Sequence, residues 1–68
     1  MIVLLAQGAS MAQAAAIEAE LARLGAGARR VDGNGRVAIE AQALGVPLGP
    51  AARVRLLQLA GVEDVMLP

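Results

Sequence analysis

The 68-residue sequence contains no histidine, cysteine or lysine, and no phenylalanine, tyrosine or tryptophan. Without cysteine it can form neither a disulfide nor a thiolate metal site, and without histidine it has no imidazole base or ligand. The absence of lysine excludes Schiff-base chemistry and a Walker-type phosphate-binding lysine. The absence of aromatic residues excludes platforms on which nucleic-acid bases stack. These absences remove the side chains on which many catalytic and nucleic-acid-binding sites depend.

Charge is also scarce and balanced. Six basic and six acidic residues give zero net charge at pH 7, and 57% of the residues are hydrophobic. This composition is too apolar for a disordered segment and lacks the basic excess that a phosphate backbone requires, so we expect no nucleic-acid partner. The longest apolar run, Met1–Ala6, is far shorter than a membrane span and follows no basic segment. We therefore expect neither a membrane anchor nor a signal peptide. The expected location of the protein is the cytoplasm.

The length predicts one domain, residues 1–68, near the lower limit for independent folding. A core built only from leucine, isoleucine, valine, methionine and alanine should be thin. Zero net charge leaves little repulsion between copies. We therefore expect the domain to form a homo-oligomer, or to pack against a larger protein.

The first half of the chain predicts a strand followed by a helix. Met1–Ala6 is apolar on both faces, which is typical of a strand covered on both sides. Ser10 and Gln13 have the spacing of a capping box, and Gly25 follows the last turn of a helix that extends to about Leu24. The apolar stripe of this helix contains Ile17, Leu21 and Leu24, and the side expected to face solvent contains Glu18, Glu20 and Arg23.

Asp32–Gly35 is the strongest turn signal and predicts a hairpin between strands at residues 26–31 and 36–41. Arg29 and Arg30 are adjacent and point to opposite faces of their strand, which suits an edge strand or a bulge.

A loop follows, and Pro50 predicts the first turn of a second helix that extends to about Ala60, with Gly61 as its cap. We expect the inward side chains of this helix to be Val54, Leu57 and Leu56, and Arg53 and Arg55 to face solvent. Residues 62–67 predict a fourth strand.

This order predicts an α+β, ferredoxin-like split βαβ fold (βαββαβ). Its antiparallel sheet of four strands has the order 4-1-3-2, and right-handed crossovers place both helices on one face. The other sheet face is then bare. We expect the interface with a partner there, formed by Val3, Leu5 and Val37, or by Ile2 and Leu4 beside Val37 or Ala38. The edge of the strand at residues 26–31 is the alternative place for this interface.

The remaining polar residues show no pattern that is typical of a catalytic or metal-binding site. The acidic residues are Glu18, Glu20, Asp32, Glu40, Glu63 and Asp64. None of them forms a recognisable acid–base pair or calcium loop, and Ser10 has no base to activate it. We expect no enzymatic activity, no metal and no cofactor. Arg29, Arg30 and Arg36 flank the hairpin and indicate either a small anion-binding patch or protection of a sheet edge.

Several short motifs resemble the N-terminal ferredoxin-like regulatory domain of 3-deoxy-D-arabino-heptulosonate-7-phosphate (DAHP) synthases. The matching segments are Met1–Leu5, Gly8-Ala9-Ser10, Leu24-Gly25, Gly33 with Arg36–Ile39, and Leu56, Leu59, Gly61-Val62 with Val65. In that family the domain precedes a TIM-barrel catalytic domain of the shikimate pathway. Paired regulatory domains bind an aromatic amino acid or similar effector between them and so control the barrel allosterically.

The resemblance implies a regulatory domain of aromatic amino-acid biosynthesis, with a homo-oligomer or a TIM-barrel domain as partner and an aromatic amino acid as effector. The family's effector contacts on strand two fall on Arg29 and Val31 here, and Arg36 lies in the matching strand-three motif. The alternative function is a stand-alone or engineered ferredoxin-like interaction module that binds no small molecule.

Overall fold

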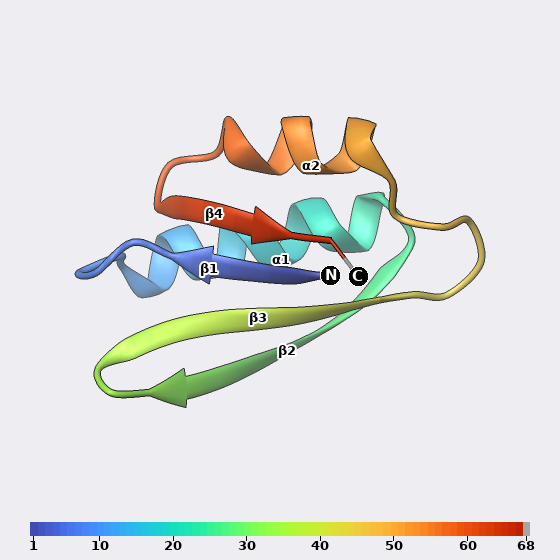
Figure 1. Cartoon of the computed structure of the whole chain (residues 1–68). Coiled ribbons are helices and arrows are strands. Elements are labelled where there is room, and N and C mark those ends of the chain that lie inside the picture. Colours follow the sequence, from blue (N-terminus) through green and yellow to red (C-terminus); the bar gives the residue numbers. More distant parts are fainter. Residues whose placement is uncertain (68) are drawn as a thin grey trace.

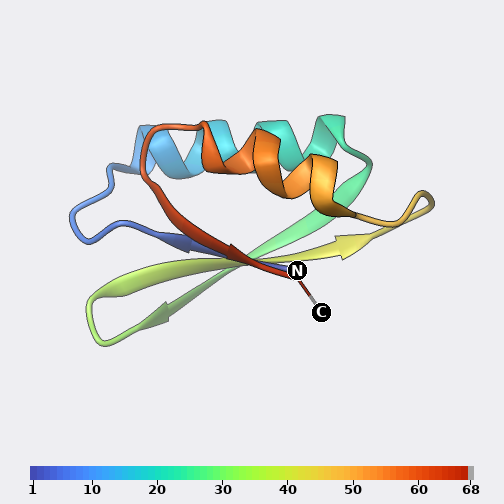
Figure 2. The ribbon, with the colours of Figure 1, turned by 45° about the horizontal axis from the view of Figure 1, so that its top comes forward.

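The computed structural model describes residues 1–67 and confirms the predicted fold class. In chain order its elements are β1 (Ile2–Leu5), α1 (Met11–Arg23), β2 (Ala26–Gly33), β3 (Arg36–Ala43), α2 (Pro50–Leu57) and β4 (Val62–Met66). The strands pair antiparallel in one sheet of order β2-β3-β1-β4. Both helices cover the same face of this sheet, which leaves the other face open (Figures 1 and 2).

Helix α1 begins where the capping box predicts. The Ser10 hydroxyl accepts a hydrogen bond from the Gln13 backbone N–H at 3.0 Å, and the Gln13 side chain accepts one from the Ser10 N–H at 2.9 Å. These two bonds satisfy donors that the first turn of a helix otherwise leaves unpaired. The helix ends at Arg23, and Gly25 reverses the chain with a φ of 81°.

The β2–β3 hairpin turns through Asn34 and Gly35, whose φ values are 53° and 75°. Positive φ at both central residues is the signature of a type I′ turn, which matches the twist of the flanking strands. Gly33 and Arg36 face each other directly beside the turn. The hairpin is longer than the sequence predicts, because β2 extends to Gly33 and β3 to Ala43.

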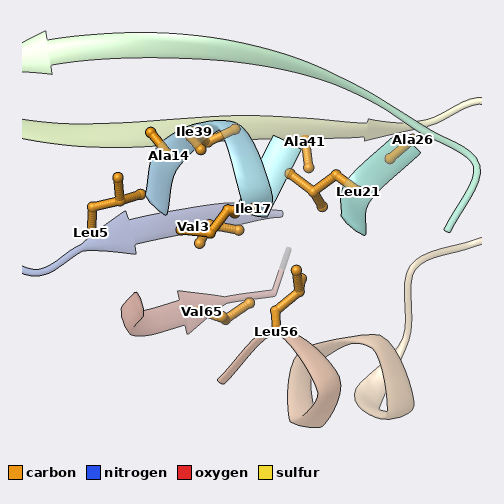
Figure 3. Close-up of a cluster of buried hydrophobic side chains, with 10 residues drawn as sticks. All are labelled: Val3, Leu5, Ala14, Ile17, Leu21, Ala26, Ile39, Ala41, Leu56 and Val65. Carbon is orange, nitrogen blue, oxygen red and sulfur yellow. The ribbon is translucent and has the colours of Figure 1, made fainter. Parts of the chain in front are cut away.

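The core lies between the sheet and the helices (Figure 3). Its fully buried large side chains are Val3, Leu5, Ile17, Leu21, Ile39, Leu56 and Val65. The larger part of α1's predicted stripe is confirmed, since Ile17 and Leu21 have no exposed surface.

The predicted interface set requires a correction. Val3 and Leu5 are 0% and 1% exposed and belong to the core, and Val37 also packs against the core. Strand pairing is the physical reason. Val3 lies opposite Ile39 and Val65, and directly opposite residues share a sheet face, so Val3 takes the face that the helices cover. The open face carries the alternative set instead.

Helix α2 also differs from the sequence prediction. It ends at Leu57 rather than Ala60, and Gly61, with a φ of 89°, lies beyond its end and leads into β4. Leu56 is its only buried residue, whereas Val54, predicted to face inward, is 56% exposed. A helix of two turns buries only a narrow apolar stripe, and in α2 the side that faces the sheet is the side that carries Leu56. Within residues 1–67, no helix has the length and apolar character that crossing a bilayer would need.

Candidate functional site

The open face of the sheet is the candidate site, because no element of the described chain covers it (Figure 2). Opposite residues on paired strands place two rows of side chains across this face. One row consists of Val31, Ala38, Leu4 and Asp64, and the other consists of Arg29, Glu40, Ile2 and Met66.

The apolar members of these rows form a cluster. We call it the open-face patch, and it consists of Ile2, Leu4, Val31, Ala38 and Met66. Ile2 is 39% exposed, Val31 38% and Met66 45%. Because these residues come from all four strands, they form one contiguous surface rather than scattered exposed side chains. Contiguous apolar surface of this kind is typical of interaction sites.

Ion pairs border the open-face patch. Both carboxylate oxygens of Glu40 accept from the Arg29 guanidinium, at 3.1 and 3.2 Å. On the opposite edge, Arg53 reaches Asp64 at 3.3 Å and the Val65 carbonyl at 2.8 Å. The face therefore presents both signs of charge around an apolar centre.

The register places the residues to which the resemblance assigns effector contacts, Arg29, Val31 and Arg36, on this same face. Arg36 pairs with Glu63 and donates to the Leu5 carbonyl at 3.3 Å, at the point where the β1–β4 register shifts. Both arginines are thus already bound to carboxylates. A shallow hollow beside Arg29, open to solvent, is lined by Gly27, Ala28, Arg29, Glu40, Ala41 and Gln42.

Arg30 points to the face of β2 opposite to that of Arg29, and there a carboxylate of α1 neutralises its charge. Its guanidinium donates to both carboxylate oxygens of Glu18 on α1, at 2.8 and 2.9 Å. The hydrogen bond from Arg30 lowers the pKa of the Glu18 carboxyl, and the same bond raises the pKa of Arg30. The pair therefore links β2 to α1.

Sequence reasoning missed a buried carboxylate. Glu20 was expected to face solvent, but it is 5% exposed and accepts from Arg23 at 2.7 Å and from Arg55 at 3.1 Å. Arg55 was expected to face solvent, and its side chain is 64% exposed, but its guanidinium also binds Glu20 and so joins α2 to α1. The three-residue spacing of Glu20 and Arg23 is a pairing signal that the sequence does contain. No local pattern indicates Arg55.

Within the described residues, no group of three or more acidic side chains is placed to hold a metal ion. In comparisons with protein families, curated proteins and solved structures, nothing matched this chain. The resemblance to DAHP synthase regulatory domains therefore stays a prediction.

Proposed function

We propose that the chain is a non-catalytic, cytoplasmic regulatory and oligomerisation domain similar to the effector-binding domain of DAHP synthases. In this proposal a second copy of the chain covers the open face of the sheet. The open-face patch is the single observation that supports it, because a face with exposed apolar side chains from β1, β2 and β4 gains stability when it is covered.

The free energy of burying the open-face patch favours its coverage by a second copy of the chain. Full burial of one large apolar side chain contributes about 1.5–3 kcal/mol, and each subunit offers partly exposed Ile2, Val31 and Met66. Several such side chains from two subunits can offset much of the entropic cost of association, which is at least about 4 kcal/mol. The chain carries no net charge, so two copies do not repel each other.

The hollow beside Arg29 suits a small zwitterion such as an amino acid. Arg29 can bind a carboxylate and Glu40 an ammonium group, once their mutual ion pair opens. Both side chains are largely exposed, with 74% and 49% of their surface accessible. Opening an exposed ion pair costs only about 0–1 kcal/mol, so this pair does not block an effector.

A second candidate function is an interaction module without a small-molecule ligand. The observation that favours it is that Arg29 and Arg36 are both satisfied by carboxylates of the same chain. The hollow beside Arg29 is also shallow and open. In that case the open face would serve association alone.

Titration calorimetry with tyrosine, phenylalanine and chorismate separates the two candidates. A regulatory domain should give saturable heat with one of them, and Arg29→Ala should weaken the affinity by about tenfold, the effect of losing about 1.4 kcal/mol. Arg23→Ala is the matched control, because Arg23 is equally exposed but lies on α1, away from the open face. Absence of heat with all three compounds would reject the effector and leave the interaction module.

A further inference from the structure

The outer edge of β2 is a second surface without a partner. β2 lies at the end of the sheet (Figure 1). All its residues from Ala28 to Gly33 are exposed. At eight residues it is longer than the average strand of about 5–6 residues. A long exposed edge strand offers its backbone groups to another strand unless charges or bulges block it.

The hairpin geometry determines which backbone groups point outward. Residues that flank a two-residue turn exchange hydrogen bonds, so Gly33 bonds to Arg36. Alternation along β2 then directs the N–H and C=O groups of Val31 and Arg29 toward β3. The same groups of Asp32, Arg30 and Ala28 point away from the sheet and are available to a partner strand.

Asp32, on this edge, differs from the other acidic residues of the described chain because it forms no ion-pair contact. Within residues 1–67, every arginine forms an ion pair, and so does every other acidic residue. Asp32 alone has no such partner, although it is exposed and two residues from Arg30. A strand that pairs with β2 and places a cation opposite Asp32 would complete the charge pairing of the chain.

We propose that a second copy of the chain supplies that strand, by antiparallel pairing of β2 with β2 about a two-fold axis at Val31. In this register Arg30 lies opposite the partner's Asp32, and Asp32 lies opposite the partner's Arg30. Arg30 binds Glu18 through Nε and one terminal nitrogen, which leaves the N–H groups of its other terminal nitrogen for a second carboxylate. Directly opposite residues of opposite charge stabilise a strand pair.

The neighbouring registers that keep each sheet face on one side are less favourable. Moving the axis to Arg29, Arg30 or Asp32 places two identical charges directly opposite each other, which destabilises a strand pair. Moving it further, to Ala28, removes the repulsion but leaves Asp32 without a cation. Only an axis at Val31 joins opposite charges and leaves no like-charged pair directly opposite.

The pairing would join two sheets into one. The two copies of Val31 would meet on the axis and connect the open-face patches of both subunits. Arg29, to which the resemblance assigns an effector contact, would lie beside this seam. The edge pairing uses the outward backbone groups of β2 and the open face uses side chains, so this proposal stands independently of the proposed function although Val31 belongs to both surfaces. The pairing involves only a few residues of each β2, whereas stable interfaces bury about 800 Å² per partner. The fraction of paired chains should therefore depend strongly on protein concentration.

Disulfide cross-linking through single introduced cysteines tests this register directly, because the chain has no cysteine of its own. Opposite residues on the axis bring their Cα atoms to about 4.5–5.5 Å, which suits a disulfide. We expect Val31→Cys to form disulfide-linked dimers in a glutathione buffer about tenfold faster than Arg29→Cys, Arg30→Cys or Asp32→Cys, whose cysteines lie off the axis. Gln58→Cys, exposed on the helical side, gives the rate of random collision.

The same variants carry Leu4→Glu in a second series, because Leu4 lies on the open face and that face could also bring two Val31 side chains together. Rapid cross-linking at position 31 in both series supports the edge pairing. Fastest cross-linking at another position overturns the register. Rates equal to that of Gln58→Cys, or loss of the position 31 dimer in the Leu4→Glu series, overturn the edge pairing itself. Asp32→Arg should slow the Val31→Cys reaction, whereas an unchanged rate would contradict the charge pairing.

Discussion

Individual polar residues determine where the elements of this domain begin and how they are joined. Gln13 caps α1 and also lies against Gly61, where an added Cβ would come within 2.9 Å of the Gln13 side-chain oxygen. Glu20 binds Arg23 and Arg55 and so connects the two helices. A thin core with few large side chains leaves such contacts a substantial part of the total stability.

The Ser10 cap gives a direct test at one residue. Ser10→Ala should lower the free energy of unfolding by about 1 kcal/mol, because the Gln13 backbone N–H loses its acceptor. Ala12→Ser is the control, since it changes an exposed residue in the same first turn and should cost less. Urea unfolding curves measure both. A neutral Ser10→Ala would contradict the assignment of the helix start.

Among the elements, the contact of α1 with β2 includes the Glu18–Arg30 ion pair. The pKa of Glu18 is lower in the folded chain than its ordinary value of 4.5. The ion pair therefore contributes stability that is present above that value and is lost as the pH falls through the folded-state pKa. Arg30 stays protonated throughout this range.

Acid unfolding checks this contact. Between about pH 5 and pH 2.5, the wild-type chain should lose more stability than Glu18→Gln, in which the titrating group is absent. Denaturant unfolding at several pH values gives both slopes. If Glu18→Gln loses stability with the same slope as the wild-type chain, then the ion pair does not contribute in solution.

The elements could be predicted from sequence where a local signal is strong. The capping box at Ser10 and Gln13 and the turn at Asn34-Gly35 are strong local signals, and both are confirmed. Contacts between distant elements have no such signal. The ion pair of Glu20 with Arg55 spans 35 positions, so nothing near either residue in the sequence predicts it. The short α2 has apolar side chains on several sides, and its inward direction depends on packing.

For the whole molecule, the order of elements predicted the sheet and the placement of the helices, but not which side of β1 they cover. Both sides of β1 are apolar, so alternation along that strand alone cannot choose between them. The choice follows from long-range pairing, which sets Val3 against Ile39 and Val65. The same pairing leaves Ile2 and Leu4 on the open face, where the candidate site lies.

Sedimentation equilibrium of Leu4→Glu and Val3→Glu at high micromolar concentration separates the two sides of β1. A wild-type chain that pairs through its open face sediments as a dimer or larger closed oligomer. Leu4→Glu loses the open-face contact and sediments as a smaller folded species, a monomer or at most the pair joined through β2, with an unchanged circular dichroism spectrum. Val3→Glu unfolds the chain, because it places a carboxylate in the core. Val54→Glu, at an exposed apolar position on α2, leaves the oligomer intact. A monomeric wild-type chain, or a Leu4→Glu variant that sediments like the wild type, would contradict association through the open face.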